Sequence, residues 1–138
     1  MITDDDIKAC ATAAEAAAKW WRRALENPVF DNGEEMNMST MLLITAGTDE
    51  QSPETLDKFE TELAEMIVRL LTLDAERPIY LGVNYHPSGV LYDAARAANM
   101  KRAPWPWKTD MHVRPDEVIV SAGYGTPNEV IWPAYLPA

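Results

Sequence analysis

The sequence predicts an α+β fold in which an N-terminal helical half of about three helices packs on a small sheet. Two observations lead to this prediction: apolar residues recur every three or four positions up to residue 71, and they alternate with other residues from Ile79 onward. With 47% apolar and 25% charged residues, the 138-residue chain has the composition of a globular protein. We expect one domain over residues 1–138, with an acidic helical half at 1–74 and a β-α-β-β half at 75–138.

The first predicted helix covers residues 3–26. Thr3 suits its N-cap, and three aspartates follow in the first turn, where the helix dipole favours negative charge. An apolar stripe rich in alanine extends from Ile7 to Leu25, and the sequence Asn-Pro at 27–28 ends the helix. The small alanine side chains predict a close contact with another helix, which could lie in the same chain or in the second copy of a homodimer.

Two further helices are predicted in this half. The shorter one covers residues 36–46 and ends at Gly47. The longer one begins after Ser52-Pro53, an N-cap followed by proline at the first helical position. Its apolar stripe makes it the main scaffold, because burying each large side chain stabilises the fold by roughly 1.5–3 kcal/mol. That stripe consists of Leu56, Phe59, Leu63, Met66, Ile67, Leu70 and Leu71.

The second half is predicted to form a strand, a helix and a hairpin. Apolar residues alternate over 79–85, which indicates a strand, and a turn at His86-Pro87 leads into a helix from Ser88 to Ala98. The alternating segments 109–114 and 117–123 are joined by an Arg-Pro-Asp-Glu turn and predict an antiparallel hairpin. Residues 128–132 could add a further strand to it.

The net charge of −10 comes entirely from the first half. Residues 1–74 hold sixteen acids and six bases, whereas residues 75–138 hold six of each. This distribution argues against binding to duplex nucleic acid, which requires a basic face. An acidic helical face suits solvation or contact with a basic protein partner.

Membrane insertion and export are also not expected. The longest apolar run, at 41–44, is far shorter than the ~20 residues of a membrane helix. The first residues, MITDDDIK, are acidic where an export signal is basic. The single cysteine, Cys10, excludes an internal disulfide and a CxxC metal site. We therefore expect a cytoplasmic protein with no membrane partner.

A first candidate site lies at the predicted junction of strand and helix, in the sequence NYHPSG. Exposed N–H groups at a helix start bind anions, and ligands often collect at strand ends. Asn84, His86, Ser88 and Gly89 could therefore contact a phosphate or a carboxylate. The alternative is that Ser88 only caps the helix and that His86 and Pro87 only form a turn.

His112 is the second candidate. It lies on the polar register of its predicted strand beside Asp110 and Arg114, where a carboxylate and an imidazole could form an acid/base pair. The alternative is a row of solvated side chains on a hairpin. Two histidines without a cysteine pair or an HExxH motif do not indicate a metal. We expect neither a metal nor a cofactor.

The sequence APWPWK forms a third candidate. Its prolines restrict the backbone and hold Trp105 and Trp107 at alternate positions, next to Arg102 and Lys108. Such rigid aromatic residues could stack on a flat ligand or anchor a protein interface. Alternatively, both indoles cover the open end of the small sheet. Tyr124, which lies between two glycines, completes the candidate contact residues.

Two stretches of the second half resemble a known group of proteins. They are IYLGVNYHPSGVLYDAARAANM and PWPWKTDMHVRPDEVIVSAGYGTPNEVIW, within residues 78–132. In layout they are similar to small uncharacterised accessory proteins of phages and prophages. The resemblance implies an accessory role in the host cytoplasm and gives no catalytic residues.

Three hypotheses on function follow. The first is a non-enzymatic, phage-type binding protein that inhibits a host protein, for example a component of a defence system. The second is a small-molecule binder that sequesters a nucleotide signal, with Arg102, Lys108 and Arg114 holding the anion. The third is a small enzyme that uses His86 or His112 as a general base. We rank it last because no nucleophile accompanies these histidines.

Overall fold

The computed structural model describes residues 4–26, 51–74, 76–84, 86–103, 105, 108–122 and 128–133. The helices are α1 (Asp4–Glu26), α3 (Pro53–Leu73) and α4 (Gly89–Ala97). The strands are β1 (Ile79–Asn84), β2 (His86–Pro87), β3 (Lys108–Val113), β4 (Val118–Ala122) and β5 (Glu129–Trp132). The predicted α+β class, with its helical half first, is confirmed. The helix predicted at 36–46 lies outside the described residues.

The strands form one antiparallel sheet in the order β2-β1-β3-β4-β5. The predicted hairpin of β3 and β4 is confirmed, and β5 extends it. Two features were not predicted: the two-residue strand β2 and the pairing of β1 with β3, from which it is separated by α4. Periodicity identifies a strand but does not identify its neighbour, so these pairings required the structure.

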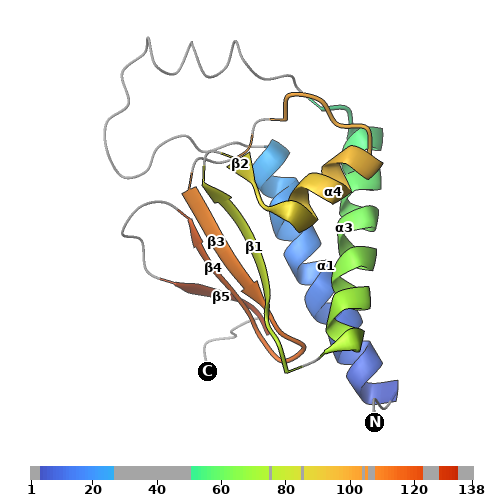
Figure 1. Ribbon diagram of the computed structural model, residues 1–138, viewed down its shortest axis with the longest axis vertical. Coiled ribbons are helices and arrows are strands. Elements are labelled where there is room, and N and C mark those ends of the chain that lie inside the picture. The colour runs from blue at the N-terminus through green and yellow to red at the C-terminus, as the bar shows by residue number, and fades with distance from the viewer. Residues whose placement is uncertain are drawn as a thin grey trace.

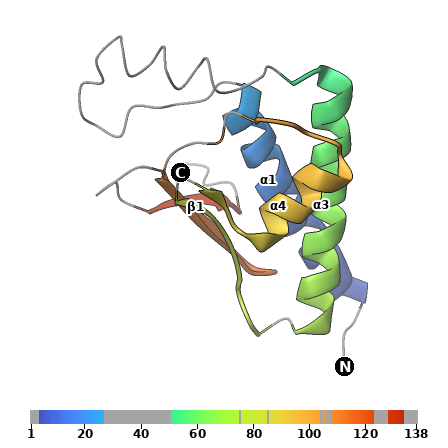
Figure 2. The ribbon, with the colours of Figure 1, turned by 45° about the horizontal axis from the view of Figure 1, so that its top comes forward.

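The three described helices lie on one side of the sheet (Figures 1 and 2). Helix α1 contacts β3, β4 and β5, whereas α3 and α4 contact β1. Among the described residues, the fold therefore has two layers, with helices on one face of the sheet.

Helix α3 begins as its sequence predicts. Ser52 is the N-cap, and its Oγ accepts a hydrogen bond from the Thr55 N–H at 3.2 Å. The buried residues of α3 are Leu56, Phe59, Leu63, Ile67 and Leu71. Two of the predicted stripe residues lie outside this set: Met66 is partly buried, and Leu70 is 38% exposed.

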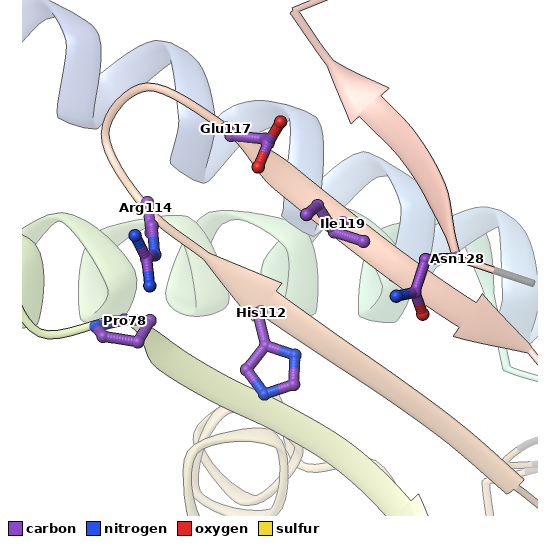
Figure 3. Close-up of a pocket in the computed structure, with 6 residues that line it drawn as sticks. All are labelled: Pro78, His112, Arg114, Glu117, Ile119 and Asn128. Carbon is purple, nitrogen blue, oxygen red and sulfur yellow. The ribbon is translucent and has the colours of Figure 1, made fainter.

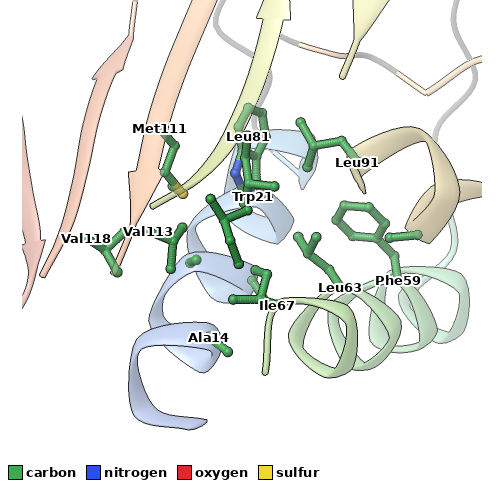
Figure 4. Packing of buried hydrophobic residues seen from close by; sticks show 14 of the residues in the cluster. Ala14, Trp21, Phe59, Leu63, Ile67, Leu81, Leu91, Met111, Val113 and Val118 are labelled. Atoms are coloured by element: carbon green, nitrogen blue, oxygen red, sulfur yellow. The ribbon is translucent and has the colours of Figure 1, made fainter. Parts of the chain in front are cut away.

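The core lies between the helices and the covered face of the sheet (Figure 4). Alternate strand residues point toward α1 and α3, as a period of two requires. These residues are Leu81, Val83, Met111, Val113, Val118 and Val120, all at most 2% exposed. They meet Trp21 of α1 and the buried stripe of α3 in one apolar cluster.

Helix α4 ends in a motif that turns the chain back over it. Asn99 has a left-handed backbone (φ 59°), and the Met100 N–H donates to the carbonyl of Ala95 at 2.9 Å. The Asn99 N–H donates to Arg96 at 3.0 Å, which completes a Schellman motif. The chain continues through Arg102, also left-handed (φ 51°), to Trp105.

We predict that Thr109→Val stabilises the protein. Thr109 is fully buried on the covered face of β3, and its hydroxyl has no hydrogen-bond partner in the part of the chain that the structure describes. Valine keeps the shape and removes a polar group that is costly to bury, so the free energy of unfolding should rise by about 1 kcal/mol or more. Urea denaturation followed by circular dichroism measures this change.

Thr72→Val is the matched control, because the Thr72 hydroxyl donates to the Arg69 carbonyl at 2.9 Å. No gain in stability is expected there. A loss of stability in Thr109→Val would show that its hydroxyl is satisfied.

Candidate functional site

The candidate site lies on the face of the sheet that points away from the helices. The strand register places Tyr80, His112, Ile119 and Val130 side by side across four strands. Directly opposed residues share a face of the sheet. Tyr80 is 45% and Val130 is 38% exposed, whereas buried residues of the other face are covered by helices. We call these four residues the open-face row.

The two middle residues of the row, His112 and Ile119, border a hollow of 390 Å³ (Figure 3). The turn between β3 and β4 forms one wall. There, the backbone N–H of Arg114 donates to the carbonyl of Glu117 at 2.8 Å, and the reverse bond is 3.3 Å. Both side chains are thereby held at the hollow. Its lining comprises Pro78, His112, Arg114, Glu117, Ile119 and Asn128.

Tyr80 is held flat against the sheet. Its hydroxyl donates to Asp110 Oδ1 at 2.5 Å, and Lys108 Nζ lies 3.5 Å from Asp110 Oδ2. The hydrogen bond to Asp110, followed by burial and then by the negative charge of Asp110, raises the pKa of Tyr80 to about 12. The ring lies over Gly82, where a Cβ atom would meet the phenol group. Gly82 thus leaves the space that lets Tyr80 reach Asp110.

We predict that Gly82→Ala displaces the Tyr80 ring, breaks its hydrogen bond and lowers its pKa from about 12 toward the ordinary value of about 10. Phenolate absorbance during a pH titration measures this shift, and Tyr80→Phe identifies the Tyr80 signal. Because the folded-state pKa is the higher one, the stabilisation that this group contributes is complete below pH ~10. It is lost as the pH rises through about 12.

Gly89→Ala is the control for this prediction, because a Cβ atom at Gly89 meets nothing within 4 Å. Its tyrosine titration should match that of the wild type. If Gly82→Ala also leaves the titration unchanged, the contact between Tyr80 and Asp110 does not control this pKa.

The residues predicted at the junction of strand and helix are partly brought together. The register places the backbones of Lys108, Asn84 and His86 in one row across β3, β1 and β2. The side chains of Asn84 and His86 lie outside what the structure describes. Ser88 occupies the N-cap position of α4, but its hydroxyl accepts the Gly82 N–H at 3.1 Å and does not cap the helix. Gly89 is exposed at the start of α4.

The predicted pair of Asp110 and His112 is arranged differently. The Asp110 carboxylate contacts Tyr80 and Lys108, while the His112 ring lies 5.5 Å from the Tyr80 ring, measured between centroids. Within the described ranges, no carboxylate forms a hydrogen bond with His112. A general base is usually oriented by such a partner, so this geometry offers little support for catalysis by His112.

Metal and thiol chemistry find no support in the described residues. They contain no group of three or more His, Cys, Asp or Glu side chains that could hold a metal ion. Cys10 is buried, and burial raises the pKa of its thiol. A buried thiol with a raised pKa is a poor nucleophile.

Trp105 lies against the core. Its ring centroid is 6.2 Å from that of Trp21 and 5.9 Å from that of Phe59, both in edge-to-face geometry. Arg102 and Trp105 also line a second hollow beside α4. Trp107 and Tyr124, the remaining aromatic candidates, lie outside the described residues. The Trp105 indole therefore packs on aromatic residues of α1 and α3, and its contact with a ligand or a partner stays a prediction.

The sequence interpretation missed Tyr80, Ile119 and Val130 as candidate site residues. Their alternating positions were visible, but alternation alone does not tell which face of a sheet remains uncovered. That information comes from the strand register together with the placement of the helices.

Comparisons with known protein families and with curated proteins found no match. No helix among the described segments is long and apolar enough to cross a membrane. The candidate site therefore depends on the geometry of the sheet face.

Proposed function

We propose that this chain is a non-enzymatic binding protein that engages a protein partner through the open-face row and inhibits it. The observation that carries the proposal is the run of Tyr80, His112, Ile119 and Val130 across four strands, on the face that no described helix covers. Tyrosine and large aliphatic side chains supply much of the contact area in protein interfaces. A broad sheet face suits another protein, whereas sites for small molecules are usually concave.

The hollow beside the row supports the same function. With a volume of 390 Å³ and Ile119 in its lining, it has room for one large side chain of the partner. Interfaces commonly derive most of their affinity from a few such anchored side chains. His112 and Arg114 line the same hollow and could bond to polar groups of that side chain.

The identity of the partner is the part of the proposal that rests on resemblance. Similarity to phage and prophage accessory proteins favours a host protein, such as a defence component, met in the host cytoplasm. Helix α3 has five acids and two bases, a charge opposite to that of a basic partner, but its Asp57 and Glu60 already pair with Arg22 of α1. We assign the remaining acids to solvation and place the contact on the open face.

Capture of the partner from host lysate tests this assignment. Ile119→Asp puts a charge in the middle of the open-face row and should abolish capture, because the charge would be desolvated in the interface. Thr61→Asp places the same charge on the exposed side of α3 and should leave capture unchanged. Circular dichroism of both variants verifies that they are folded. Undiminished capture by a folded Ile119→Asp protein would overturn the proposal.

A further inference from the structure

A second hollow lies on the helix side of the molecule, between α4 and the chain that follows it. Its volume is 270 Å³, and its lining includes Tyr92, Arg96, Met100, Arg102 and Trp105. It is thus a concave site with two aromatic rings, one thioether and two guanidinium groups. It shares no lining residue with the hollow at the open-face row.

The charge around this hollow is the reverse of that of the whole protein. Residues 92–109 contain four bases and one acid, Asp93, although the chain carries a net charge of −10. Two of those bases, Arg96 and Arg102, line the hollow, and its described lining contains no acid. A concave site with this local charge attracts anions.

The fold positions these groups on rigid supports. Arg96 is in the last turn of α4, and the Schellman motif returns Met100 over Ala95. Arg102 has a left-handed backbone, which is uncommon for a residue other than glycine and is often found at functional positions. Trp105 is fixed by its edge-to-face contacts with Trp21 and Phe59.

We infer that this hollow binds a compact aromatic phosphate monoester, of the size of a nucleoside monophosphate. Arginine guanidinium groups bind phosphate oxygens in bidentate geometry, and two of them match the charge of a phosphate monoester. Tyrosine and tryptophan rings provide stacking surfaces for a flat base. The volume lies just below the range of about 300–1,000 Å³ for most small-molecule sites, so one base is accommodated better than two.

Isothermal titration calorimetry with two probes, adenosine 5′-monophosphate and phenyl phosphate, tests the inference. At least one probe should bind, more tightly than inorganic phosphate alone and, for the nucleotide, more tightly than adenosine alone. Arg96→Gln and Arg102→Asn should each weaken binding by roughly tenfold or more, because each removes a charged hydrogen-bond donor. Asparagine is chosen at 102 because it tolerates the left-handed backbone. Arg69→Gln on α3 is the control and should bind like the wild type.

Several results would overturn the inference. They are failure of both probes to bind at millimolar concentration, inorganic phosphate binding as tightly as the probes, and adenosine binding as tightly as the nucleotide. Unchanged affinity in the two variants would equally exclude a role for Arg96 and Arg102. None of these results bears on the open-face row, because the two hollows share no lining residue. For the same reason, Ile119→Asp should leave nucleotide binding unchanged.

Discussion

Replacement of Trp21 by alanine is expected to lower the free energy of unfolding by about 3–5 kcal/mol. Trp21 of α1 is fully buried in the core (Figure 4). Its ring contacts Trp20 at a centroid distance of 5.0 Å and Trp105 at 6.2 Å. Truncation leaves a cavity and removes both edge-to-face contacts, each of which contributes about 0.5–1.5 kcal/mol beyond burial. Chemical denaturation measures the loss.

Leu73→Ala provides the comparison for this prediction. Leu73 is 78% exposed at the end of α3, so its truncation should change stability by no more than about 0.5 kcal/mol. Trp21→Phe should fall in between, since it keeps a ring and removes an indole N–H that has no partner among the described residues. If Trp21→Ala behaved like Leu73→Ala, the aromatic cluster would not be part of the core.

Trp105 belongs to this aromatic cluster, so a substitution of Trp105 tests the stability of the fold as well as the role of the APWPWK segment in binding. Its contacts with Trp21 and Phe59 mean that Trp105→Ala should also reduce stability. A loss of partner binding in that variant could therefore arise from unfolding. Positions in the open-face row that lie outside the core, such as the half-buried Ile119, separate binding from folding more cleanly.

The second large effect is expected from Ala14→Leu. Ala13, Ala14, Ala17 and Ala18 are all 0% exposed, because α1 is packed against α3 and against the sheet. The added methyl groups have no space, and overpacking of this kind typically costs about 1–3 kcal/mol. Thermal and urea denaturation should both show the loss.

Ala97→Leu is the matched control, since Ala97 is exposed near the end of α4. It should change stability little. Full stability of Ala14→Leu would mean that α1 is not closely packed. The sequence left open whether the alanine-rich stripe packs within the chain or against a second copy. In the structure it is covered by elements of the same chain.

Local signals predicted most of the described elements. The Ser52-Pro53 start of α3 and its apolar stripe specify a helix within a few residues, because capping and periodicity act over one or two turns. The hairpin of β3 and β4 was predicted for the same reason, since its strands are joined by a short turn. In contrast, the pairing of β1 with β3 joins residues about 30 positions apart, and no local pattern encodes it.

The candidate site was less accessible from sequence than the fold. His112 was recognised from its register, but its neighbour Tyr80 belongs to another strand, and the two meet only through the pairing of β1 with β3. Asp110 was assigned to His112 because the two are close in sequence, whereas a cross-strand contact brings it to Tyr80. The hollow beside α4 depends on a chain reversal at Asn99 that the alanine-rich sequence did not indicate.

The most direct test of the proposed binding face is site-specific photo-crosslinking in a lysate of the proposed host. A benzophenone amino acid is placed at Ile119 in one protein and at Thr61, on the exposed side of α3, in another. The open-face assignment predicts one discrete adduct from position 119, none from position 61, and loss of the adduct when excess unlabelled wild-type protein competes. An adduct formed from position 61 and not from 119 would place the partner on the helical face and contradict the account.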